Sequence, residues 1–381
     1  MDAESSFRGR RCPVIMREGF RVFFLVAAGW AALALLLYML QLSGVVVMAP
    51  AFSVVDWHIH EFLFGYAGAV IAGFALTVVP TWSRRPPLGG PRLLALVVLW
   101  LAGRFAMTWG AGLGASAVAA IDLAFPLVLM LLVGRSLPAL ALIGLFLLAN
   151  AGFHHEVAAA GVADHAARAG IAVILTLMIL VGGRIIPAFT REWMTAHGDP
   201  ALPSDFDVFD GVTIAVSALG LGLWSMAPYA PTSALVLAFA GLLNFARLAR
   251  WHGSHVRTEG LLAVLHIAYA FIPVGLLAMA LSAFDPLLMP PSAAMHLLTI
   301  GAITMMTLAV MTRISLDYTG RPLHADRVIL AIFIAMTLSL LARFAYALQP
   351  GYTLLLASAA LWIVTFLVFL WRFGFLARSR F

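Results

Sequence analysis

The sequence is a succession of apolar stretches, each about 20 residues long, joined by short polar segments. A helix of about 20 apolar residues is long enough to cross the hydrocarbon core of a membrane. Of the 381 residues, 63% are hydrophobic and only 10% are charged. Ordinary soluble domains carry about 25% charged residues. These values exclude a soluble α/β enzyme, a disordered chain and a secreted disulfide scaffold, and they predict an all-α polytopic membrane protein.

We expect about twelve transmembrane helices. They form a single integral membrane domain over residues 1–381, with no separate soluble domain. The longest polar stretch between them runs from Thr190 to Asp210. The predicted spans are 20–43, 58–82, 92–110, 113–134, 136–160, 168–190, 208–228, 231–250, 259–284, 291–313, 326–347 and 351–372.

The distribution of positive charge predicts the topology. All 23 basic residues are arginines, and most lie in alternate connections or in the terminal segments. Because cytoplasmic loops carry the excess of positive charge, both termini are predicted to be cytoplasmic. Arg168 is the exception, in a connection predicted to lie outside. The arginines that follow the rule are Arg8, Arg10, Arg11, Arg17, Arg21, Arg84, Arg85, Arg92, Arg135, Arg191, Arg247, Arg250, Arg257, Arg313, Arg321, Arg327, Arg372, Arg378 and Arg380.

The same scatter of arginines argues against a nucleic-acid partner. The net charge of +6 comes from residues between apolar segments, and no basic domain is present. The single cysteine, Cys12, excludes structural disulfides, a two-thiolate copper centre and a covalent CxxCH haem attachment.

A weak internal repeat runs through the chain. His60-x4-Gly65 and His296-x4-Gly301 each begin a span, and each is followed in the next span by an arginine, Arg104 or Arg343. A fainter third copy begins at His165. A period of four helices suggests three four-helix units related by pseudo-threefold symmetry, and the packing has to decide between this and chance similarity.

Histidines are the informative polar residues within the spans, where polar side chains are costly. At about 1.5 Å of rise per residue, five of them fall in the outer half of the membrane. His266 is the exception, because the predicted boundaries put it in the inner half. The five histidines of the outer half are His58, His60, His154, His155 and His296.

Imidazole is a common ligand for haem iron and for copper, so these histidines predict a metal or haem site. His58 and His60 point about 200° apart on a helix and therefore address different neighbours. The adjacent His154 and His155 diverge by about 100°, so both reach one ion only if the helix is distorted.

Two arginines and two glutamates lie at a similar depth. Arg104 and Arg343 are inside spans and need an anion, which a haem propionate or a glutamate supplies. Glu61 and Glu156 each follow a histidine pair. We expect either glutamate to be a ligand, to orient a ligand, or to carry protons from the outside. Asp56 and Asp122 are weaker candidates, and Asp122 is expected to form a local hydrogen bond.

Several motifs together resemble the NnrS family over nearly the whole chain. They are His58-Ile59-His60-Glu61-Phe62-Leu63-Phe64-Gly65-Tyr66, Pro80-Thr81-Trp82, Arg85-Pro86-Pro87-Leu88, Asn150-x3-His154-His155, Gly182-Gly183-Arg184-Ile185-Ile186-Pro187-Ala188-Phe189-Thr190, Arg250-Trp251, Leu265-His266-x2-Tyr269, the stretch from His296 through Thr304, Met311-Thr312-Arg313, and Thr319-Gly320-Arg321-Pro322-Leu323. The resemblance implies a bacterial inner-membrane protein that contains haem and copper and acts in the response to nitric oxide.

The histidine inventory is also similar to that of the haem–copper oxidase superfamily, although the His154–His155 helix is out of that superfamily's order. This analogy makes His58 and His60 haem ligands. It places His154 and His155 on copper, together with His266 or His296. His296 is otherwise a further haem ligand. The expected cofactors are haem b and copper, and the second metal could be iron.

The leading hypothesis is a membrane oxidoreductase that binds and reduces nitric oxide in the periplasmic half of the bilayer. Glu61 and Glu156 are its predicted catalytic residues, and the electron donor is an unknown quinol or cytochrome. Two alternatives remain open: a non-catalytic sensor or scavenger of nitric oxide, and a transporter of a metal or another small molecule.

Overall fold

The structure is a computed structural model that describes residues 13–82, 86–133 and 137–378. All regular structure in these ranges is helical, and 12 helices are long and apolar enough to cross a membrane. The predicted number and kind of spans are thus confirmed. Cys12 and the arginines Arg8, Arg10, Arg11, Arg84, Arg85, Arg135 and Arg380 lie outside the described residues.

The observed spans agree closely with those expected from hydropathy. The main difference is the sixth, which continues to Ala196. The twelve are Gly19–Leu42, Val54–Thr81, Pro91–Leu113, Ala115–Val133, Ala139–Ala160, Asp164–Ala196, Val208–Met226, Pro231–Ala249, Gly260–Phe284, Pro291–Asp317, Arg327–Leu348 and Tyr352–Gly374.

Contacts divide the chain into two compact units. Unit 1 comprises Met1–Gly170, Ile314–Pro322 and Phe366–Phe381, and unit 2 comprises Ile171–Arg313 and Leu323–Thr365. The predicted single domain and the predicted three four-helix units are not tested by this division, and both stay predictions.

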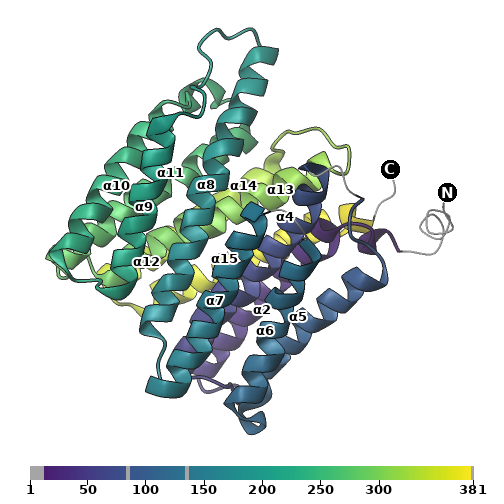
Figure 1. The fold of residues 1–381 in the computed structure, drawn as a ribbon, viewed down its shortest axis with the longest axis vertical. Helices are drawn as coiled ribbons and strands as arrows, with labels where there is room; N and C mark the ends of the chain where they lie inside the picture. The colour runs from purple at the N-terminus through teal and green to yellow at the C-terminus, as the bar shows by residue number, and fades with distance from the viewer. Residues whose placement is uncertain (1–12, 83–85, 134–136, 379–381) are drawn as a thin grey trace. The chain divides into compact units, whose positions relative to one another are not determined.

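Unit 1 is built on successive packed helices (Figure 1). Helix α2 (Gly19–Leu42) packs against α4 (Ala67–Trp82). Helix α6 (Ala115–Val133) packs against both α5 (Pro91–Trp109) and α7 (Leu137–Ala160). Buried aromatic side chains fill this unit, among them Phe23, Trp57, Phe64 and Phe153.

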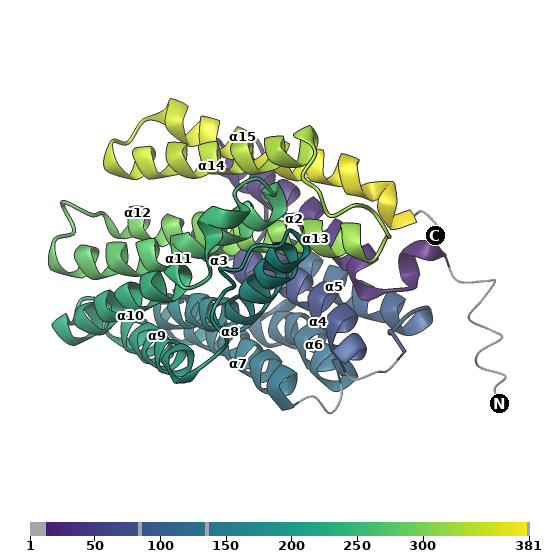
Figure 2. The same cartoon turned by 90° about the horizontal axis from the view of Figure 1, so that it is seen from above.

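Unit 2 contains a row of three helices that follow one another in the chain and lie side by side (Figure 2). They are α9 (Val208–Met226), α10 (Pro231–Ala249) and α11 (Gly260–Phe284). Helix α8 (Asp164–Ala196) begins in unit 1 and continues into unit 2, and α14 (Arg327–Leu348) lies in unit 2.

Two spans change helix type at the same place, directly after a histidine. The short helix α3 (Val54–His60) passes into a π-helix, η2 (Glu61–Tyr66), and then into α4. The short helix α12 (Pro291–His296) passes into a π-helix, η5 (Leu297–Thr304), and then into α13 (Met305–Asp317). Short π-helical turns are rare and occur frequently at functional sites. The two π-helices follow His60 in the second span and His296 in the tenth span, and this agreement supports the repeat between spans one to four and spans nine to twelve.

Three prolines inside helices lie four positions after a residue whose side chain or carbonyl faces buried polar groups. A proline has no N–H, so it leaves the carbonyl of the residue four positions earlier without its helical donor. Pro126 follows Asp122 in α6, Pro187 follows Gly183 in α8, and Pro273 follows Tyr269 in α11. Each proline therefore supplies a carbonyl oxygen that has lost its helical partner beside buried polar side chains.

Arg247 in α10 binds the carbonyl that Pro187 leaves in α8. Its Nη2 donates to the Gly183 carbonyl at 3.4 Å and its Nη1 to the Ile179 carbonyl at 2.8 Å. A Cβ at Gly183 would collide with the guanidinium, which explains a glycine there. Arg247 is fully buried, so it is not the loop marker of topology that its position in the sequence suggests.

The charge of Arg247 is balanced by Asp210 in α9, which accepts from Nε at 2.6 Å. The Tyr269 hydroxyl accepts from Nη1 at 3.1 Å and donates to Asn244 Oδ1 at 2.7 Å. These contacts link α8, α9, α10 and α11 in unit 2 through one hydrogen-bonded network.

Replacing Arg247 by alanine should strongly destabilise unit 2, because it removes the cation that lies closest to the buried Asp210 and leaves only Arg250, 3.5 Å from Oδ2, beside it. Breaking such a pair costs about 3–5 kcal/mol of unfolding free energy. Thermal unfolding of the protein in nanodiscs, followed by tryptophan fluorescence, measures the effect. Arg191→Ala is the control, since Arg191 pairs with the exposed Asp205 at 2.7 Å and should change the melting temperature little. Equal effects of the two substitutions would contradict this account.

Candidate metal centre

Asp122 in α6 is the centre of a buried polar cluster in unit 1. Its Oδ1 accepts a hydrogen bond from Arg104 Nη2. Its Oδ2 accepts from Asn150 Nδ2 at 2.8 Å and lies 3.1 Å from His154 Nε2 and 3.2 Å from His60 Nε2. Asp122 is 1% exposed, so these four groups replace water around its carboxylate.

Glu61 is the second carboxylate of the cluster. Its Oε1 accepts from Arg104 Nη1 at 2.7 Å and lies 3.2 Å from His60 Nδ1. Arg104 therefore pairs with Glu61 through one terminal nitrogen and with Asp122 through the other. The need of Arg104 for an anion within its span is met by these two carboxylates.

Local sequence brings these side chains together. Asn150 and His154 are one turn apart on α7 and so share a face. Gly103 precedes Arg104 on α5, and a Cβ there would lie 3.0 Å from Asp122 Oδ1. At Gly65 in η2, a Cβ would lie only 2.5 Å from Arg104 Nη1. The two glycines therefore give Asp122 and Arg104 the room that they need.

Aromatic rings enclose the imidazole of His60. The ring centroids of Phe52, Phe64 and Phe153 lie 5.6, 5.2 and 5.3 Å from that of His60. The His154 ring lies 5.3 Å away. Exclusion of water strengthens the electrostatic interactions inside the cluster.

The cluster contains two carboxylates and one guanidinium. The two nitrogens of His60 lie against oxygen atoms, Nδ1 against Glu61 Oε1 and Nε2 against Asn150 Oδ1 at 2.9 Å. Oxygen atoms accept hydrogen bonds, so this arrangement suits an imidazole with a proton on each nitrogen. One further positive charge balances the second carboxylate, and either a proton or a metal ion supplies it.

His60, Asp122 and His154 could hold a metal ion. One donor atom from each of them lies within 4.8 Å of the others, and all three residues are buried. Metal–ligand bonds of about 2.0–2.2 Å require donor atoms at such separations. Two imidazoles and one carboxylate are the donor set of many non-haem iron sites, and imidazole also binds copper.

A haem ligated by His60 does not fit this arrangement. An axial ligand needs one ring nitrogen directed at the iron, with open space for the porphyrin. The His60 imidazole is instead fully buried and packed against three phenylalanine rings and the His154 ring.

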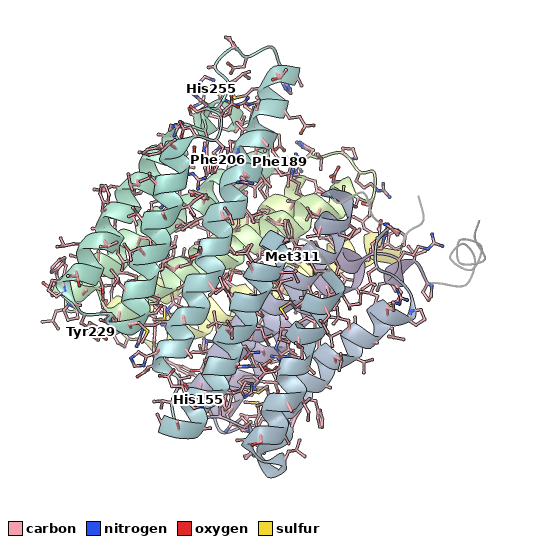
Figure 3. The ribbon with its side chains drawn as sticks, in the orientation of Figure 1. His155, Phe189, Phe206, Tyr229, His255 and Met311 are labelled. Atoms are coloured by element: carbon pink, nitrogen blue, oxygen red, sulfur yellow. The ribbon has the colours of Figure 1, made fainter. Side chains whose placement is uncertain are left out.

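Three other predicted residues of unit 1 lie outside the cluster. The His58 ring stacks on Tyr38 with centroids 4.2 Å apart. His155 is exposed near the end of α7, so the structure does not bring it to the ion that His154 could bind (Figure 3). Glu156 accepts from the backbone nitrogens of His165 and Ala166 at 3.0 and 2.7 Å.

The role of Glu156 is therefore visible in the structure as a helix cap. Its carboxylate takes two backbone donors in the first turn of α8, which carry the positive end of the helix dipole. The His165 Nδ1 lies 2.9 Å from the same carboxylate. These contacts stabilise the start of α8, and none of them joins the cluster.

The remaining predicted residues lie in unit 2. His266 Nδ1 lies 3.0 Å from the Leu262 carbonyl. His296 Nδ1 lies 2.5 Å from the Ser292 carbonyl. The Arg343 guanidinium lies 4.9 Å from the centre of the Tyr346 ring. Their part in a haem or copper site stays a prediction.

Asp122 and Asn150 are the residues that the prediction undervalued. Asp122 was expected to form only a local hydrogen bond, and this is corrected by its contacts with α3, α5 and α7. The available signal was the rarity of an aspartate within a span. Asn150 stands one turn before His154, a spacing that places both side chains on one face.

Gly65→Ala should destabilise the protein because the added methyl group collides with the Arg104 guanidinium. Forcing extra volume into a packed core costs about 1–3 kcal/mol. Gly29→Ala is the matched control: Gly29 is also inside a span, no atom of the described residues lies within 4 Å of a Cβ there, and alanine favours the helix. Thermal unfolding of both variants in nanodiscs tests this. If Gly65→Ala is as stable as Gly29→Ala, the Arg104 guanidinium does not pack directly against Gly65.

Comparison with known proteins agrees with the motifs. A model of the NnrS family, described as NnrS protein, matches residues 14–380. No curated protein matches the chain. Because the match covers nearly the entire sequence, the chain belongs to the NnrS family.

Proposed function

We propose that this chain is a multi-pass protein of the bacterial inner membrane that binds nitric oxide at a buried transition-metal centre and reduces it. The observation that carries the proposal is the buried group of His60, Asp122 and His154. The family resemblance contributes nitric oxide as the ligand, and the arginine distribution supports cytoplasmic termini.

The donor set suits copper or iron. Either ion, when bound, supplies redox chemistry and a coordination position for a small diatomic ligand. The role of the chain is to hold the ligands in place. Asp122 contributes a carboxylate that Arg104 and Asn150 orient, and such hydrogen-bonded partners fix a ligand's direction and tune the ion.

Nitric oxide is small and weakly polar, so it can enter from the lipid and needs no polar channel. Reduction of two molecules to nitrous oxide and water takes two electrons and two protons. We assign the protons to Glu61, which contacts His60 directly. Glu156 serves as a helix cap, which makes it the weaker catalytic candidate. A quinol or a cytochrome supplies the electrons.

Haem b remains part of the proposal through the family resemblance. His60 does not fit as its ligand, so His58 in unit 1 and His296 in unit 2 are the candidates, with Arg343 for a propionate. A pyridine haemochrome assay on His58→Ala and His296→Ala identifies the ligand. Retention of haem by both variants would reject this assignment.

The test of the metal centre is metal content. Protein purified in nanodiscs should contain about one copper or iron ion per chain at the cluster, and His154→Ala or Asp122→Asn should lose it. His155→Ala is the matched control, because its imidazole is exposed on the same helix and should leave the metal content unchanged. Equal loss from His154→Ala and His155→Ala, or wild-type content in both, would overturn the assignment.

Nitric oxide consumption separates the proposed activity from its alternatives. With a reductant present, the wild-type protein should consume nitric oxide at an electrode, and His154→Ala should not. Spectral changes on adding nitric oxide without turnover would instead support a sensor or scavenger. Metal uptake into proteoliposomes without any response to nitric oxide would support a transporter.

A further inference from the structure

Trp30 in the first span and Phe271 in the ninth span occupy equivalent places in the repeat that relates spans one to four to spans nine to twelve. Trp30 lies in α2, which begins at Gly19, and Phe271 lies at the same distance from the start of α11 at Gly260. The span after each contains the histidine, the π-helix and its glycine.

The two aromatic residues make the same contact. A Cβ at Gly65 would lie 3.0 Å from Trp30 Nε1, and a Cβ at Gly301 would lie 2.7 Å from Phe271 Cγ. In both groups an aromatic ring from the first helix therefore packs against the glycine of the π-helix. Since phenylalanine makes this contact at Gly301, packing alone does not require a tryptophan at position 30.

Unlike phenylalanine, tryptophan has an N–H that can donate a hydrogen bond. The repeat that has the tryptophan also has an acidic residue after the histidine. Glu61 follows His60, whereas Leu297 follows His296 at the equivalent position. The group with the carboxylate has Trp30 on its glycine, and the group with the leucine has Phe271. A hydrogen-bond acceptor at position 61 thus accompanies a donor at position 30, and the apolar Leu297 accompanies the apolar Phe271.

Two buried polar atoms meet at Gly65. Glu61 is fully buried and Trp30 is 8% exposed. Within the described residues, neither Glu61 Oε2 nor Trp30 Nε1 has a hydrogen-bond partner. Both lie close to one point, since a Cβ at Gly65 would be 2.9 Å from Oε2 and 3.0 Å from Nε1. A buried donor and a buried acceptor that both stay unpaired are costly, so side chains that can pair tend to do so.

We propose that Trp30 is a positioning residue of the metal centre, whose indole N–H donates to Glu61 Oε2 across Gly65. Both atoms flank the place that a Cβ of Gly65 would occupy, and Gly65 has no side chain to keep them apart. The hydrogen bond fixes Glu61 so that Oε1 stays on Arg104 and His60. His60 is thereby held beside Asp122 and His154. The effect on metal binding rests on the proposed function, but the hydrogen bond itself does not.

Trp30→Phe is the direct test of the effect on the metal. The variant should fold, because phenylalanine makes the equivalent contact at Gly301, and its affinity for copper(II) or anaerobic iron(II) should fall about tenfold. Trp224→Phe is the matched control. Among the described residues Trp224 Nε1 is also buried without a partner, but Trp224 lies in unit 2, and the metal affinity of this variant should stay at the wild-type value. Wild-type affinity in a folded Trp30→Phe protein would overturn the role in metal binding.

The indole N–H resonance tests the hydrogen bond independently of metal. In protein labelled with ¹⁵N-tryptophan, the Trp30 signal is assigned by its disappearance in Trp30→Phe. Glu61→Gln should shift this signal and leave the Trp224 signal in place. An unmoved Trp30 signal would reject the hydrogen bond. If the signal shifts but the wild-type protein binds no metal, the hydrogen bond stands and the proposed metal function fails.

Discussion

The pairing of one guanidinium with two carboxylates, away from water, is the interaction on which unit 1 depends. Arg104 on α5 binds Glu61 of η2 and Asp122 of α6. A buried charge without a partner is far more costly than one paired and hydrogen-bonded, so these three residues fix how their helices meet. Asn150 and His154 of α7 then attach to Asp122. Donor atoms from three separate helices are thereby held close enough to share an ion.

Sequence alone predicted the spans and several members of the cluster. Hydropathy defines a span because lipid tolerates few polar side chains, and the observed helices agree with this at nearly every boundary. The same cost makes a polar residue inside a span conspicuous, which is how His60, Glu61, Arg104 and His154 were found. For these four residues, the position along the span was enough to identify them as candidate site residues.

Position around the helix axis could not be predicted, and this explains what was missed. His154 and His155 are adjacent in sequence, but rotation about α7 buries one and exposes the other. Asp122 carries a single charge in an apolar span, and only packing shows that three helices converge on it. Arg247 has the sequence context of a loop marker, but the carbonyl that Pro187 leaves in α8 gives it a buried partner. Each case depends on a neighbour distant in sequence.

The order of the cluster residues along the chain has a consequence for how the protein enters the membrane. Spans are delivered to the bilayer from the N-terminus onward, so the span with Arg104 arrives before the span with Asp122. Glu61 is already present in the preceding span and can neutralise Arg104 at that stage. The hairpin from Val54 to Leu113 can therefore cross the bilayer as a neutral pair, and Asp122, Asn150 and His154 are added to it later. Glu61 thus neutralises Arg104 before its second carboxylate partner reaches the bilayer.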